Sequence, residues 1–187
     1  MDMNAMMSSS MTVLTKPSVA SFQSVKGRVN TMTTVVGLVV VGAIGGLLIG
    51  LLGGVGQMVT GLIIGAIVTP IVYYIGQVIL WVIARVLGGK GDLQTQANLV
   101  GTFYVPLYLL NIILNLIPVV GTILALLVGL YELVLLTFGL QAAHAYTILR
   151  AVLTWLVIVF IVAILAACFL ILLGPQIANI YSTLPGQ

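Results

Sequence analysis

The stretch that organises this chain is Arg85-Val-Leu-Gly-Gly-Lys-Gly-Asp92. From about residue 33 to residue 173 the chain is apolar apart from this break, Glu132, His144 and Arg150. Long apolar runs separated by short polar breaks are typical of helices that cross a membrane. The sequence therefore predicts a protein with several membrane spans.

The composition agrees with that class. The chain has 187 residues, of which 61% are hydrophobic and 5% charged, and its mean hydropathy is +1.31. Soluble domains carry roughly 25% charged residues. The net charge is +3, but the basic residues are scattered rather than gathered in a stripe, which does not favour nucleic acid as a partner. The single cysteine, Cys168, permits no disulfide within the chain.

Five spans are expected, in an all-α integral membrane bundle. The predicted spans are Val35–Leu52, Met58–Leu87, Leu99–Leu116, Val119–Leu140 and Ala151–Leu173. The first apolar run has no small-residue cleavage site after it, so we expect an uncleaved anchor. The membrane domain would cover residues 31–175, followed by a short external tail at 176–187.

Two segments precede the first span. Residues 1–15 are rich in Met and Ser and have no hydrophobic period, so we expect a flexible tail. In residues 16–30 the apolar side chains fall at helical spacing on one face, namely Val19, Phe22, Val25 and Val29. This pattern, flanked by cations, predicts an amphipathic helix lying on the membrane surface. An ordinary lead-in to the first span is the alternative.

Small residues mark the first two spans. Glycines recur every fourth residue, at Gly42, Gly46, Gly50 and Gly54, and the second span opens with Gly61 and Gly65. Faces of this kind let two helices approach closely where the hydrophobic effect cannot drive packing. We expect a tight hairpin between the two spans. A homodimer through the first face is the alternative.

The cations predict the topology. They are Lys16, Lys26, Arg28, Arg85, Lys90 and Arg150, and all fall on one side of a five-span chain. The segments 53–57, 117–121 and 174–187, on the other side, contain no Lys or Arg. Because cytoplasmic loops are enriched in Lys and Arg, the N-terminus should be cytoplasmic and the C-terminus outside.

Several motifs resemble those of the Yip family of small polytopic membrane proteins. They are Leu14-Thr-Lys-Pro-Ser-Val-Ala-Ser-Phe22, Leu87-Gly-Gly-Lys-Gly91, Val105-Pro106, Leu116-Ile-Pro118 to Gly121, and the series Gly129-Leu-Tyr131, Gly139-Leu140, His144 and Arg150-Ala151. The resemblance covers nearly the whole chain and implies a five-span bundle with a cytoplasmic N-terminus. Eukaryotic relatives are associated with Rab GTPases and vesicle traffic. This chain lacks their Asp-Leu-x-Gly-Pro motif and longer hydrophilic N-terminal domain, so it looks like a prokaryotic member in the plasma (inner) membrane.

Glu132 is the first candidate for chemistry. An ionised carboxylate inside a bundle is costly, so Glu132 should be neutral, paired or in a wet cavity. A polar stripe on the third span, formed by Tyr104, Tyr108, Asn111 and Asn115, should face protein. A structural lock, with Tyr104, Arg85 or Arg150 as the partner of Glu132, and an ion or proton site both stay open.

His144 lacks the companions of a metal site, and no metal is expected. A histidine at a helix end is the simpler interpretation, but His144 could alone bind a cofactor such as a chlorin or haem. The loop 88–92 lacks the spacing of a phosphate-binding loop and is expected to be flexible, in a place where it could touch lipid phosphates. No serine lies between Ser24 and Ser182, and neither aspartate lies in a span, so the known intramembrane protease arrangements are excluded.

The expected function is therefore non-enzymatic. We expect a scaffold or accessory subunit that packs against membrane lipids and against other membrane subunits or its own copies. No cofactor is expected, although bound lipid or pigment stays open. The alternative is a small carrier or proton-coupled transporter that uses Glu132 with the polar stripe of the third span.

Overall fold

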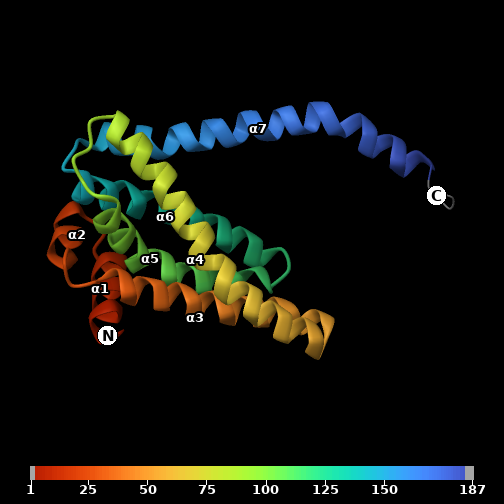
Figure 1. The fold of residues 1–187 in the computed structure, drawn as a ribbon, viewed down its shortest axis with the longest axis horizontal. Coiled ribbons are helices and arrows are strands. Elements are labelled where there is room, and N and C mark those ends of the chain that lie inside the picture. The colour runs from red at the N-terminus through yellow and green to blue at the C-terminus, as the bar shows by residue number, and fades with distance from the viewer. Residues whose placement is uncertain (1–2, 184–187) are drawn as a thin grey trace.

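The computed structural model describes residues 3–183, and this part of the chain is entirely helical (Figure 1). The helices are α1 (Met3–Thr15), α2 (Val19–Val25), α3 (Thr31–Gly50), α4 (Val55–Val86), α5 (Leu93–Asn115), α6 (Val120–His144) and α7 (Ile148–Thr183), with a short 3-10 turn, η1 (Leu51–Gly53), after α3. Five of them, α3 to α7, are long and apolar enough to cross a membrane. The all-α, five-span prediction is confirmed.

Helices α2, α3 and α5 begin at capping residues. The Asn30 side chain accepts a hydrogen bond from the Thr33 N–H, and Asp92 accepts one from the Thr95 N–H. Ser18 accepts from the Ser21 N–H in the same way. Because such caps satisfy the free N–H groups of a first turn, α3 and α5 start four to six residues before the apolar runs that predicted them.

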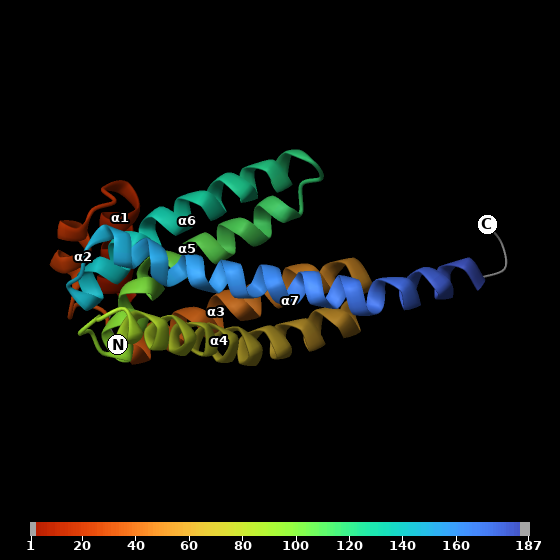
Figure 2. The same ribbon diagram turned by 90° about the horizontal axis from the view of Figure 1, so that it is seen from above.

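The spans form two antiparallel hairpins and one diverging helix. Helix α3 packs between α4 and α5, and α6 folds back along α5 (Figures 1 and 2). Helix α7 contacts α4 and α6 and then runs past the end of the bundle (Figure 2). The hydrophobic core at the end of the bundle where α1 and α2 pack includes Phe22, Leu38, Tyr73, Phe103 and Leu135.

The predicted flexible tail is wrong over residues 3–15, which form α1. Helix α1 packs on α5, α3 and α2, and it buries Met6, Ser9 and Val13. The Tyr131 hydroxyl donates a hydrogen bond of 2.6 Å to the Leu14 carbonyl and holds the end of α1 on α6. No hydrophobic period marked this helix because serine contributes to its buried face.

The predicted surface helix is also corrected. Helix α2 has seven residues, and its apolar side chains Phe22 and Val25 are buried against protein rather than laid on a membrane. The Phe22 ring meets Phe103 edge to face at a centroid distance of 6.0 Å. It also lies beside Gly139, so α2 rests on α5 and α6.

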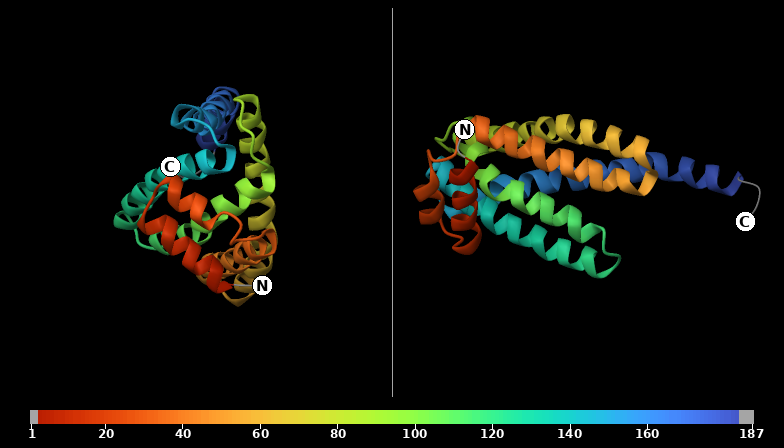
Figure 3. Two further views of the ribbon diagram at one scale, coloured as in Figure 1. Left: turned by 90° about the vertical axis from the view of Figure 1, so that its left-hand side faces the viewer. Right: turned by 90° about the horizontal axis from the view of Figure 1, so that it is seen from below.

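One end of the bundle gathers the basic segments. Helices α1 and α2, the loop between α4 and α5, and the loop between α6 and α7 lie together there (Figures 1 and 3). We call this the basic end. It carries six exposed cations, namely Lys16, Lys26, Arg28, Arg85, Lys90 and Arg150. The turn η1 and the turn before α6 lie at the opposite end (Figure 1).

Candidate functional site

The loop between α4 and α5 is folded around His144 at the basic end. The Gly91 N–H donates to His144 Nδ1 at 3.1 Å, and the Lys90 N–H donates to the His144 carbonyl at 3.3 Å. The Trp81 indole N–H donates to the Gly91 carbonyl at 3.1 Å. The loop expected to be flexible is therefore tied to α4 and α6 through its backbone.

A buried chain of hydrogen bonds continues from His144. Because Nδ1 accepts a hydrogen bond from Gly91, Nε2 must carry the ring hydrogen and donate it to Gln96 Oε1, 2.8 Å away. The Gln96 amide then donates to Gln77 Oε1 at 2.9 Å and to the Gln77 carbonyl at 3.0 Å. These three buried side chains connect α4, α5 and α6.

His144 has no ring nitrogen free for a ligand. Both nitrogens are used in hydrogen bonds, and the ring stacks on Tyr146 at a centroid distance of 5.3 Å. A chlorin or haem bound through His144 would have to break one of these two hydrogen bonds. No group of three or more His, Cys, Asp or Glu residues is placed to hold a metal within the described part of the chain.

The glycines of this loop are required by close packing. A Cβ atom on Gly89 would lie 2.7 Å from His144 Nδ1 and 2.8 Å from the Ala84 carbonyl oxygen. A Cβ on Gly91 would collide with the Ala143 carbonyl. Gly88 has a φ of +87°, a conformation that residues with a side chain rarely adopt. The Gly-Gly-Lys-Gly run thus lets the loop lie directly on the end of α6.

Glycines also form the contact between α3 and α4. A Cβ atom added to a glycine of α3 would collide with the backbone of α4. The facing pairs are Gly42 and Gly65, Gly46 and Gly61, and Gly50 and Gln57. The structure therefore places these faces within one hairpin. Gly54 does not belong to the contact, because it has a φ of +93° in the turn before α4 and open space around it.

Glu132 lies at the middle of α6 and pairs with α5. The Asn111 amide donates to Glu132 Oε1 at 3.0 Å. The partners expected from the sequence, Tyr104, Arg85 and Arg150, form no hydrogen bond or ion pair with Glu132 in the described structure. The partner of Glu132 in the structure is thus the Asn111 amide, which joins α5 to α6.

The polar stripe of α5 is split between protein and surface. Tyr104 stacks with Tyr108 at 5.6 Å between ring centroids and packs on Tyr73 of α4 at 4.9 Å. Asn115 is exposed and donates to the Asn111 carbonyl in its own helix. The prediction that the whole stripe faces protein is therefore wrong at Asn115, which lies at the end of the helix.

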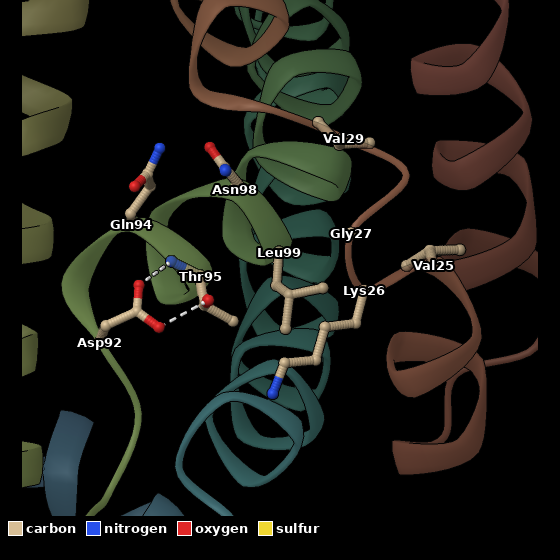
Figure 4. Close-up of a pocket in the computed structure, with 9 residues that line it drawn as sticks. All are labelled: Val25, Lys26, Gly27, Val29, Asp92, Gln94, Thr95, Asn98 and Leu99. Carbon is tan, nitrogen blue, oxygen red and sulfur yellow. Dashed lines mark hydrogen bonds between the residues drawn. The ribbon is translucent and has the colours of Figure 1, made fainter.

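A small cavity lies beside α2 at the basic end (Figure 4). Its volume is about 120 Å³, and it is lined by Val25, Lys26, Gly27, Val29, Asp92, Gln94, Thr95, Asn98 and Leu99. Asp92 is turned toward Thr95, whose N–H and hydroxyl each donate to it at 2.7 Å (Figure 4). These hydrogen bonds lower the pKa of the Asp92 carboxyl below its ordinary value.

A family model for the Yip1 domain matches residues 11–171. The chain belongs to the Yip1 domain family. No curated protein and no solved structure matches it. The Yip1 match starts within α1 and ends within α7, so it includes α2, the loop around His144, four of the spans in full and most of the fifth.

Several of the Yip-like motifs meet at the basic end. Phe22, from the Pro-containing N-terminal motif, lies against Gly139 of α6. The glycine-rich loop of the Yip1 domain lies on His144, and a Cβ on Gly88 would come within 3.2 Å of the Arg150 guanidinium. Motifs that are far apart in the sequence thus form one packed unit.

The sequence reasoning missed Gln77, Gln96 and Tyr73 of this Yip1 domain. Gln77 and Gln96 complete the hydrogen-bonded chain, and the Tyr73 hydroxyl donates to the Ala97 carbonyl at 2.6 Å. An uncharged amide within an apolar helix was the available signal for Gln77. Its partner could not be identified from the sequence because helix pairing decides it.

Proposed function

We propose that this Yip1-family protein is a non-enzymatic scaffold or accessory subunit of a membrane assembly. It would lie in the plasma (inner) membrane of a prokaryote, with its basic end facing the cytoplasm. The proposal rests on one observation. In the α7 span Ile148–Gly174, no residue of the most apolar part is buried within the chain. In the other four spans, 11–44% of the residues of the corresponding part are buried.

The surface of α7 supports an assembly role. The side chains of this helix are all exposed from residue 159 to residue 172, where it has left the bundle. Helices in a membrane associate by close packing rather than by a hydrophobic driving force, so such a span is available to a neighbouring subunit or to a second copy. The polar contacts around His144 and Gln96 hold the rest of the bundle together and present no reactive group.

Cys168 provides a direct test. It is the only cysteine of the chain and is exposed on α7. Thiol cross-linking in native membranes, followed by mass spectrometry, should join Cys168 to a partner subunit or to a second copy. As a control, Cys168→Ser combined with Val59→Cys moves the thiol to the exposed face of α4.

Two outcomes are decisive. A discrete product from Cys168, with little from Val59→Cys, would support an assembly through α7. The scaffold proposal fails if neither thiol cross-links although both react with a soluble maleimide after solubilisation, and if the tagged protein purifies alone as a monomer.

A second candidate, a small proton-coupled carrier, is favoured by Glu132 at the middle of a span. It ranks lower because a cavity of about 490 Å³ along α3 and α4 is lined by Tyr108 but not by Glu132. In liposomes carrying an internal pH dye, a carrier should lose proton-coupled uptake in Glu132→Gln while keeping its fold. Equal fluxes in both proteins would remove this candidate.

A further inference from the structure

Asn111 and Glu132 form a polar pair between the α5 and α6 spans. Glu132 is the only acidic side chain within any of the five spans. The Asn111 N–H group donates to Glu132 Oε1 at 3.0 Å. The other polar atom of the amide, Asn111 Oδ1, is buried and has no hydrogen-bond partner in the described structure.

The Asn111 Oδ1 atom needs a hydrogen-bond donor. A buried polar atom without a partner is costly, most of all in a hydrocarbon environment where no bulk water can replace the missing bond. An ionised Glu132 cannot supply the donor, since a carboxylate only accepts hydrogen bonds.

Turning the amide over does not remove the requirement. The two ends of an Asn side chain are assigned from their hydrogen bonds, so the opposite orientation must also be considered. In that orientation Asn111 Oδ1 would face Glu132 Oε1 at about 3.0 Å, and two acceptors would be in contact unless Glu132 carried a proton. Both orientations therefore need a protonated acid or another donor.

We propose that Glu132 binds one proton and closes a cyclic acid–amide pair with Asn111. The acid O–H donates to Asn111 Oδ1, and the Asn111 N–H donates to the carbonyl oxygen of the acid. The proton comes from water and returns to water when the acid ionises, so no other reactant is needed. The pair is a one-proton site that joins α5 to α6.

The surroundings favour the neutral form of Glu132. On α5, Tyr104 interacts electrostatically with Glu132, and Tyr108 stacks on Tyr104. On α6, the Tyr131 hydroxyl is already bonded to the Leu14 carbonyl. Neither α2 nor the part of α7 beyond Arg150 brings a cation to it, since all Lys and Arg residues lie at the basic end. An ionised Glu132 would thus be a charge in the membrane without a counter-charge.

Infrared spectroscopy can detect whether the Glu132 carboxyl group is protonated. In the whole protein reconstituted in phosphatidylcholine liposomes at pH 7, we expect a carbonyl band of a protonated carboxylic acid that is absent from Glu132→Gln. In Asn111→Leu, which removes both hydrogen-bond partners, the band should move to higher frequency. If subtraction of the Glu132→Gln spectrum reveals only carboxylate bands at pH 7, Glu132 is ionised and the proposal is overturned.

Stability provides a second measurement with a matched variant. Glutamine at position 132 can form the same two hydrogen bonds without binding a proton, so Glu132→Gln should match the wild type at about pH 4, where the acid is mostly protonated in the folded and unfolded chains alike. As the pH rises, the wild type should lose stability while Glu132→Gln stays constant. The proposal is also overturned if Glu132→Gln is as unstable at pH 7 as Asn111→Leu, or if the wild type shows no pH-dependent loss beyond that of Glu132→Gln. Neither measurement depends on a scaffold or carrier role, so failure here would leave the proposed function to its own tests.

Discussion

At the scale of single residues, the polar side chains around His144 act as bonds between helices. His144 is 1% exposed and Gln96 is completely buried, yet every nitrogen and oxygen of their side chains has a partner. In a bundle whose helices are surrounded by apolar groups, such bonds supply specificity that apolar contacts cannot, because any apolar face fits many others.

Substitution of Gln96 should show this role. Gln96→Leu leaves the His144 N–H without an acceptor, so we expect a loss of about 1–3 kcal/mol in the free energy of unfolding. The neighbouring Gln94 is exposed and makes one hydrogen bond, to Thr31, so Gln94→Leu should change stability by about 0.5 kcal/mol or less. Unfolding in mixed micelles with increasing SDS measures both. Equal effects would contradict the structural role of Gln96.

Asp92 adds a dependence on pH. Its folded-state pKa lies below the ordinary value of 3.8, so the carboxylate stabilises the fold fully above that value, and the stabilisation is lost as the pH falls through the lowered pKa. We expect Asp92→Asn, which keeps the cap, to remove this acid-dependent loss. Thermal unfolding between pH 2 and 6, a range set by roughly two units around the ordinary pKa, measures it. An unchanged acid profile in Asp92→Asn would refute the assignment.

At the scale of elements, the α3–α4 hairpin depends on the absence of side chains. Its two helices approach until backbone atoms of Gly46 and Gly61 are in contact range, and a methyl group on either would require the helices to separate. The contact belongs to the folded monomer, so it should be insensitive to dilution of the protein in detergent.

Gly46→Leu should therefore disrupt the hairpin. We expect a loss of about 1–3 kcal/mol or more in the free energy of unfolding, measured in SDS mixed micelles, since the added side chain must force the helices apart. Gly76, on the same α4 helix, has open space where a Cβ would lie, so Gly76→Ala should be neutral or stabilise by up to about 1 kcal/mol. Comparable stability of Gly46→Leu and the wild type would remove the packing argument.

The elements differ in how far the sequence predicts them. Apolar length predicts each span, because a membrane imposes one thickness on all of them. Glycine spacing indicates the faces of α3 and α4, since a period of four residues marks one side of a helix. The roles of α1, Gln96 and Asn111 could not be predicted in this way. Each depends on a residue from a distant helix, and no local pattern records that pairing.

At the scale of the whole molecule, charge and length predict the orientation in the membrane. The exposed cations gather at one end, and α7 has 36 residues. At about 1.5 Å per residue α7 is roughly 54 Å long, which exceeds a hydrocarbon core of about 30 Å. Its last turns should extend beyond the membrane on the side opposite the basic end.

Labelling in intact cells tests this orientation. In a Cys168→Ser background, Lys90→Cys places a thiol at the basic end and Val119→Cys places one in the opposite turn, where Val119 is 72% exposed. A membrane-impermeant maleimide should label Val119→Cys in intact cells, and Lys90→Cys only after lysis. The reverse pattern would invert the topology.

The hydrogen bond from Tyr131 to Leu14 also bears on how the protein is made. It joins residues 117 positions apart, and α2 likewise rests on α6. At about 5–20 residues per second, a ribosome needs roughly 6–23 s to pass from Leu14 to Tyr131, its partner on α6. Until then α2 and the end of α1 lack their contacts with α6, so they are exposed to proteases and chaperones. The docking of α2 and of the end of α1 must therefore wait for the synthesis of α6.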